Sequence, residues 1–415
     1  MLYGVKIMSS VEISTNSEWL VWARETAHYD IEGIAKKFNK SPETIKNWEK
    51  TGKIEYNNLV KLAKYYQRPT SVFFSKSKPK YEEKNLHDFR TFDNKNTVSI
   101  TSDIEFELRN ARFRRKVLLN IEKEHDEFEI FDFAFKNFNS ENIEILAENI
   151  RIAIGMKPFR FKNGLDYWIQ ELESKGILIF EFYGIDPDEI RGYALYQDKL
   201  PIIGFNYREY KNSQKFTLFH ELAHIILKQS SISNIYDYDL KYDEETLCNK
   251  IAAEILVPSK MFKRVIADYR ENNLKSNDID CLASYFNVSK DVIIRKTIDL
   301  GFITDNIYKK RIKEFKSYLN ERKHTTTANK KDTDSKGVSE QEINGEDEIK
   351  KLTPDEKYQK QASEILRKNG KYFTRKMFEA YEYGLISDLE LARDLDTSLY
   401  VIDKIKETVS KEKSF

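Results

Sequence analysis

Apolar residues near the start of the chain recur at the spacing of amphipathic helices. Residues 17–75 contain four such segments, and the second has its apolar residues at i, i+3, i+4 and i+7, on one helix face: Ile31, Ile34, Ala35 and Phe38. Ser41 followed by Pro42 is a strong helix start, because serine caps a helix N-terminus and proline fits the first helical position. The pattern predicts an all-helical N-terminal unit over residues 15–78.

The apolar pattern changes near residue 140, after a helical connector predicted over residues 79–139. Short apolar runs rich in β-branched and aromatic residues then predict three strands, at 177–182, 191–196 and 200–206. Helical patterns surround these runs and continue to about residue 318. Residues 140–318 are therefore predicted to form an α+β domain with a small sheet.

A polar stretch interrupts the pattern a second time, at residues 319–352. A segment with so few apolar residues buries too little surface to offset the entropy of ordering, so we predict a disordered linker there. Helical patterns return over residues 353–415 and predict a small C-terminal helical unit. The expected fold class is therefore multidomain and mainly α, with one α+β domain between two helical units.

Composition narrows the class of protein. The chain has 69 Lys and Arg against 68 Asp and Glu, so its net charge does not indicate a nucleic-acid-binding protein. Any basic surface that binds nucleic acid must be confined to one part of the protein. Its two cysteines form no CxxC motif, and no apolar run is long enough to span a membrane. We expect a soluble cytoplasmic protein without a membrane partner.

The segment HELAH carries the residue types needed for metal-assisted hydrolysis. His220 and His224 are four residues apart in a helical pattern, so both imidazoles lie on one helix face and can bind one metal ion. Glu221 lies one position round from His220, where it can act as the general base toward the attacking water. The alternative is a polar helix whose histidines are solvated or satisfied in the core.

A catalytic zinc ion takes three protein ligands and keeps one position open, so a third ligand is expected on a nearby helix. The next helical segment offers Asp243, Glu244, Glu245 and Glu254. Glu245 shares a face with Ala252, whose small side chain allows close packing on the metal-binding helix. Glu254 lies nine residues on, about 180° round the helix. Glu245 is therefore preferred as the third ligand.

Two segments resemble a known family. QKFTLFHELAH, at 214–224, is similar to the active helix of the ImmA/IrrE metallopeptidases, and ETLCNKIAAEILVP, at 245–258, is similar to their following helix. The resemblance runs from about residue 140 to 310 and implies a zincin-like fold. It also implies a Zn²⁺ ion held by His220, His224 and Glu245, with Glu221 as the catalytic residue.

The segment 31–50 resembles the helix-turn-helix of phage repressors, the XRE type. The resemblance implies that the helix from Pro42 lies in the DNA major groove. The implied DNA contacts are Lys40, Pro42, Glu43, Thr44, Lys46, Asn47 and Lys50. Residues 16–75 have ten Lys and Arg against seven acids, a net charge of +3. This modest charge predicts weak nonspecific binding to DNA unless the protein forms a homodimer. A helical packing unit without DNA is the alternative.

The spacing of that segment recurs twice. The second copy, with Asn287 and Ser289 at the turn, lies within residues 279–289, and a fainter third copy begins at Leu391. We interpret both as packing units of the same shape, with a second DNA-binding element as the alternative.

The combined resemblances imply a DNA-binding regulatory zinc metallo-endopeptidase whose protein substrate is a repressor, of the helix-turn-helix type, or another regulatory protein. The alternative is a non-enzymatic transcriptional regulator or antitoxin whose metallopeptidase-like domain senses a ligand or binds a partner. We expect the strand at Gly192–Tyr193 to hold substrate by edge pairing. The oxyanion-stabilising residue is left open among Tyr193, Tyr236 and Tyr238, and the native metal is also left open.

Overall fold

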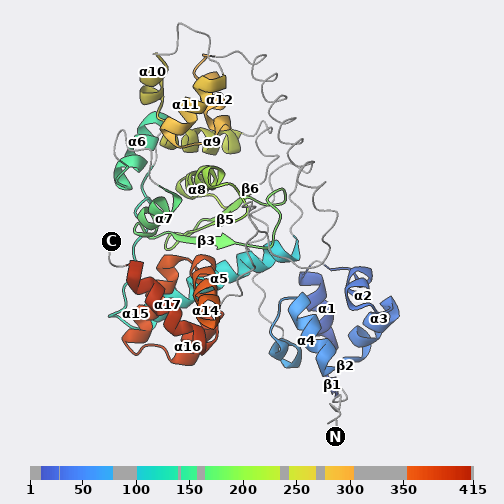
Figure 1. Cartoon of the computed structure of the whole chain (residues 1–415). Coiled ribbons are helices and arrows are strands. Elements are labelled where there is room, and N and C mark those ends of the chain that lie inside the picture. The colour runs from blue at the N-terminus through green and yellow to red at the C-terminus, as the bar shows by residue number, and fades with distance from the viewer. Residues whose placement is uncertain are drawn as a thin grey trace.

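The computed structural model describes residues 11–27, 29–77, 101–138, 142–156, 164–233, 243–267, 276–302 and 353–412. In these ranges the protein is mainly helical, with two small sheets, which confirms the predicted fold class (Figure 1). The predicted linker at 319–352 lies outside the described residues. Among the described helices, none combines the length and the apolar character that a membrane span requires.

The N-terminal unit has a hydrophobic core of its own, built around residues such as Leu20, Ile34, Ile45 and Leu59. A short antiparallel sheet, β1 with β2, was not predicted, because strands of three residues carry too little pattern. The unit comprises β1 (Glu12–Ser14), α1 (Ser17–Thr26), α2 (Ile31–Phe38), α3 (Pro42–Thr51), β2 (Lys53–Glu55), α4 (Tyr56–Tyr65) and the 3-10 helix η1 (Thr70–Phe74).

Helices α2 and α3 are joined by a three-residue turn. Asn39 ends α2 in the left-handed conformation, with φ of 50°. The side chain of Ser41 accepts a hydrogen bond from the Thr44 backbone N–H, and Pro42 occupies the first turn of α3. The predicted start of α3 is confirmed.

The middle of the chain forms a four-stranded sheet with strand order β3-β5-β4-β6. Strand β3 is parallel to β5, and β4 is antiparallel to both of its neighbours. The elements are α5 (Ser102–Glu124), α6 (Ile143–Ala153), α7 (Leu165–Glu173), β3 (Leu178–Phe182), β4 (Gly192–Leu195), β5 (Ile202–Asn206), α8 (Lys211–Ile226), β6 (Ser231–Ser233), α9 (Asp243–Leu256), α10 (Ser259–Ile266), α11 (Ser276–Phe286) and α12 (Lys290–Asp299).

Alternate residues of the sheet face two different hydrophobic cores, as the period of a strand requires. Ile179 and Ala194 face the core that includes α6 to α12. Phe180 and Tyr193 face a second core, formed with α5 and the C-terminal helices. The sheet thus lies between two helical layers, with α8 on one side and α14 to α17 on the other (Figure 1).

The C-terminal helices complete the second core instead of forming a separate one. They are α14 (Pro354–Asn369), α15 (Lys371–Glu382), α16 (Asp388–Asp394) and α17 (Leu399–Glu412). Helices α14 and α15 pack on β3, and the backbone N–H of Tyr372 donates to Glu173 of α7. This differs from the sequence prediction, which treated residues 353–415 as an independent unit.

The two repeats of the turn spacing give the same local geometry. Asn287 and Asp396 adopt left-handed φ values of 54° and 52°, and Ser289 caps α12. Val292 and Ile293 of α12 are buried in the core that includes α6 to α12, so the helix has little exposed surface with which to contact DNA. This burial favours the interpretation of the second copy as a packing unit.

Candidate metal centre

Helix α8 carries the HELAH segment through the interior of the protein. Every residue of α8 from Gln214 to Ile226 is buried, because α8 packs on β4 and β5 on one side and along α9 on another. The side-chain amide of Gln214 donates to the carbonyl oxygens of Asn206 and Tyr207, which ties the start of the helix to the end of β5. The position of the two histidines is therefore fixed by the surrounding layers.

The ligand atoms predicted from the sequence converge. The Nε2 atoms of His220 and His224 are 3.1 Å apart. Glu245 on α9 places Oε2 3.2 Å from His220 Nε2 and Oε1 3.2 Å from His224 Nε2. Among the described residues these three form the group of His, Cys, Asp and Glu side chains that is able to hold a metal ion.

The packing of α9 on α8 explains why Glu245 is the acid that reaches the histidines. Ala252 is fully buried on α9, and α9 packs along α8. Burial alone would raise the pKa of Glu245, but the contacts with His220 and His224 outweigh it and hold this pKa well below its usual range. The Glu245 carboxylate is therefore ionised and directed at the imidazoles.

The other two carboxylates of α9 lie elsewhere. Glu244 is exposed. Glu254 is buried and accepts hydrogen bonds from the backbone N–H and hydroxyl of Ser259 and from Lys296 of α12. Glu254 therefore holds α9, α10 and α12 together, and the preference for Glu245 agrees with this arrangement.

Glu221 lies next to the histidines in a fully buried position. Its Oε2 accepts a hydrogen bond of 2.8 Å from the Ser231 hydroxyl, and its Oε1 has no hydrogen-bond partner among the described residues. Burial raises the pKa of Glu221, although the two histidines and the hydroxyls of Ser233 and Ser231 oppose it. A carboxyl group with a raised pKa is suited to accept and return a proton near neutral pH.

Gly192 makes room for this carboxyl group. A Cβ atom at position 192 would lie 2.8 Å from Oε1 of Glu221 and 2.5 Å from Cγ2 of Thr217. Any larger residue would displace Glu221 or the strand, so the close approach of β4 to α8 depends on this glycine.

The residues present fit a zinc ion. Two imidazoles and one carboxylate are the ligand set of a common class of catalytic zinc sites. Ligands about 2.0–2.1 Å from zinc in a tetrahedral arrangement are about 3.3 Å from one another, close to the separations found here. Glu245 Oε2 is buried beside His220 Nε2 and has no hydrogen-bond partner among the described residues. A bound cation would satisfy this buried oxygen.

Two expectations about substrate binding are not met. Strand β4 lies between β5 and β6, so Gly192–Tyr193 has no free edge and the expected edge pairing at that strand is wrong. Tyr193 points to the opposite face of the sheet, where its hydroxyl donates to Glu107 of α5 at 3.0 Å, so it is not an oxyanion donor at this site. Tyr236 and Tyr238 lie outside the described residues.

Several residues around the site were not predicted from the sequence. Ser231 was missed because β6 was not predicted. Cys248 is buried one turn after Glu245, and this position on the same helix face was a signal available in the sequence. Glu209 also lies near Glu221. It accepts a hydrogen bond from Thr217, and burial raises its pKa to about 7.

The predicted DNA contacts lie in the turn between α2 and α3 and along α3. Glu43, Lys46, Asn47 and Lys50 are exposed on α3, while Ile45 and Trp48 of the same helix point into the N-terminal core. Lys40 is exposed in the turn, and Pro42 and Thr44 are half-buried at the start of α3. Of the α3 residues expected to face outward in a DNA-binding helix, Glu43, Lys46 and Asn47 are accessible, whereas Thr44 is only partly so.

A comparison with known protein families gives a match in the middle of the chain. Residues 173–297 match the IrrE N-terminal-like domain, the model of peptidase family M78, from the end of α7 to α12. The match supports a metallopeptidase-like domain and thus the corresponding part of the predicted resemblance. No curated protein matches the chain by sequence.

Among solved structures, a Mycobacterium tuberculosis transcriptional regulator matches at 18% identity, with a TM-score of 0.27. The alignment covers 44% of this chain and 50% of the regulator, so it spans half the length of that protein.

Proposed function

We propose that the protein is a DNA-binding regulatory zinc metallo-endopeptidase that cleaves a regulatory protein, with a helix-turn-helix repressor as the substrate class. The observation that carries this proposal is the convergence of His220, His224 and Glu245 beside the buried carboxyl group of Glu221. A domain that only bound a ligand or a partner would have no need of Glu221, whose burial without full hydrogen bonding is costly.

In the proposed reaction each residue of the site has a separate task. His220, His224 and Glu245 would hold the zinc ion, which when bound polarises the scissile carbonyl and lowers the pKa of water. Glu221 accepts a proton from the attacking water at Oε1, which has no hydrogen-bond partner in the described part of the chain, and returns it to the leaving amine. Ser231 holds Oε2 and so fixes the orientation of the carboxylate.

Cleavage is tested with zinc-loaded protein and a peptide library prepared from a cellular proteome. New peptide termini, identified by mass spectrometry, should appear with the loaded protein. They should disappear when 1,10-phenanthroline removes the metal and return when one equivalent of zinc is added, because the site depends on zinc. Cleavage that persists in the chelator, or no cleavage by the loaded protein, would contradict the proposal.

DNA binding is the second part of the proposal and rests on the N-terminal unit. Support comes from the three-residue turn between α2 and α3, which is the connection of a helix-turn-helix, and from the exposed polar face of α3. The modest positive charge of the unit favours binding as a homodimer, in which two copies of α3 would contact two half-sites.

We expect selection from a random duplex library to enrich one sequence motif. Lys46→Ala/Lys50→Ala should weaken binding to that motif and lower the slope of log K against log salt by about one per phosphate-contacting lysine lost. Lys123→Ala is the control, since Lys123 is exposed on α5, outside the N-terminal unit. Failure to enrich any motif would refute DNA binding by this unit.

A further inference from the structure

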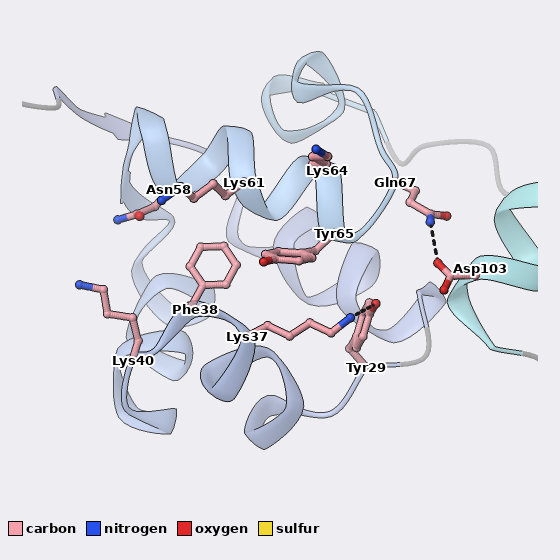
Figure 2. A pocket seen from close by; sticks show the side chains of 10 residues that line it. All are labelled: Tyr29, Lys37, Phe38, Lys40, Asn58, Lys61, Lys64, Tyr65, Gln67 and Asp103. Atoms are coloured by element: carbon pink, nitrogen blue, oxygen red, sulfur yellow. Dashed lines mark hydrogen bonds between the residues drawn. The ribbon is translucent and has the colours of Figure 1, made fainter. Parts of the chain in front are cut away.

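A pocket of about 580 Å³ lies in the N-terminal unit, on the side of α2 and α4 (Figure 2). Its volume is within the range of small-molecule binding sites, about 300–1,000 Å³. The pocket is separate from the metal centre and none of its residues takes part in the proposed hydrolysis. Its lining consists of Tyr29, Lys37, Phe38, Lys40, Asn58, Lys61, Lys64, Tyr65, Gln67 and Asp103.

The charge of the lining favours an anion. Four of the ten lining residues are lysines, and Asp103 is the one acid among them. The Asp103 carboxylate accepts a hydrogen bond of 3.1 Å from Gln67, and no described carboxylate pairs with Lys40, Lys61 or Lys64. Concentrated positive charge in a concave site raises the local concentration of anionic ligands.

The pocket also presents aromatic rings. Lys37 Nζ donates to the hydroxyl of Tyr29 at 2.7 Å and lies 4.4 Å from the centre of that ring. Phe38 and Tyr65 contact each other edge to face, with ring centres 5.3 Å apart. Aromatic side chains beside lysines are the combination that stacks nucleic-acid bases and binds their phosphates.

The two ends of the pocket differ in chemistry. Lys40 and Asn58 lie at one end, and Gln67 and Asp103 lie at the other, with the rings between them (Figure 2). Phosphates fit the lysine end, whereas the amide oxygen of Gln67 and the carboxylate of Asp103 accept hydrogen bonds from hydroxyl or amino groups. This arrangement fits a ligand that carries phosphates at one end and hydrogen-bond donors at the other.

We propose that this pocket binds a purine nucleoside triphosphate. Lys40 and Lys61 hold the phosphates, Lys64 adds positive charge beside Tyr65, and the rings of Phe38 and Tyr65 contact the base (Figure 2). A DNA duplex fits less well, because its bases are stacked inside the helix and do not reach rings in a recessed site.

The pocket bridges two parts of the protein. Asp103 belongs to α5, and the hydroxyl of Ser102, also on α5, donates to Tyr29 at 3.0 Å. Arg109 of α5 donates to the backbone carbonyl of Gln67. A ligand in the pocket therefore contacts both the N-terminal unit and the helix that forms part of the second core, so it stabilises their association.

The test is calorimetric titration of the full chain with ATP and with GTP, each in excess Mg²⁺, beside inorganic triphosphate. At least one nucleotide should bind, and at least about tenfold more tightly than triphosphate, because only the nucleotide has a base to stack. Lys61→Ala/Lys64→Ala should weaken nucleotide binding about tenfold or more. Both lysines are exposed on α4 and alanine favours helices, so the fold should persist, which a thermal melt checks.

Lys46→Ala/Lys50→Ala is the matched control, because it removes two lysines of the same unit that lie on α3, outside the pocket. This variant should bind the nucleotide like the wild type. The proposal is overturned if neither nucleotide binds at 1 mM or if triphosphate binds equally well. It is also overturned if the Lys61/Lys64 variant binds the nucleotide normally, or if that variant loses affinity for duplex DNA by the same factor as for nucleotide.

Discussion

Replacing Glu221 by glutamine should reduce peptide hydrolysis by about 10²- to 10⁴-fold, the range in which a positioned general base contributes. Glutamine has the size of glutamate and still accepts the hydrogen bond from Ser231, but its amide cannot take up the proton of water. The measurement is the initial rate of cleavage of an identified peptide by wild-type and Glu221→Gln protein, each loaded with zinc.

Two readouts separate loss of the base from loss of the site. Zinc content and melting temperature of Glu221→Gln should match those of the wild type, since Glu221 is not among the three converging ligands. A variant that keeps its zinc and still cleaves at the wild-type rate would show that Glu221 is not the general base. The protein would then belong with regulators that keep the domain for binding alone.

The second large effect is expected from Glu245→Ala, which should lower zinc affinity by well over about 100-fold, because even groups that only orient a ligand contribute 10–100-fold. The two imidazoles would remain, but the carboxylate that lies 3.2 Å from both would be absent. Competition with a fluorescent zinc chelator measures the change.

Glu244→Ala is the matched control for this prediction. Glu244 is the adjacent residue on α9 and has the same charge, but it is exposed and does not belong to the converging group of ligands. Its replacement should leave zinc affinity unchanged. Equal losses in the two variants would mean that overall negative charge, and not a ligand at Glu245, attracts the metal.

The candidate site was largely predictable from the sequence because it depends on local geometry. The spacing of His220 and His224 fixes their common face on any helix, whatever surrounds it. Glu245 was preferred by the same reasoning, from the face it shares with Ala252 and from the position of Glu254 on the other side of α9. The structure brings Glu245 to the histidines and assigns Glu254 to contacts with Ser259 and Lys296.

The surroundings of the site depend on contacts between distant segments and were less predictable. The strand order places β4 between β5 and β6, so Gly192 approaches Glu221 while Tyr193 points to the other core. The sequence of β6, Ser231–Ser233, contains one apolar residue among three, which is too little pattern to predict a strand. The Ser231 contact with Glu221 was therefore missed.

The position of the C-terminal helices was also missed, although β3 carried a signal. The run Leu178–Phe182 is nearly all apolar and buried throughout, which is typical of a strand covered on both faces. A helical layer was therefore required on each side of the sheet. The polar segment at 319–352 suggested a separate unit, but the length of a connection does not determine whether the helices beyond it pack back on the sheet.

The most direct test of the metal centre is zinc X-ray absorption spectroscopy of the purified protein, together with its metal content. We expect about one zinc per chain, with two imidazole ligands and only nitrogen and oxygen at about 2.0–2.2 Å. Cys248 makes the experiment decisive, since it is buried on α9 close to His224. A zinc–sulfur distance of about 2.3 Å, or no bound zinc after zinc is supplied, would contradict the assignment of His220, His224 and Glu245 as the ligands.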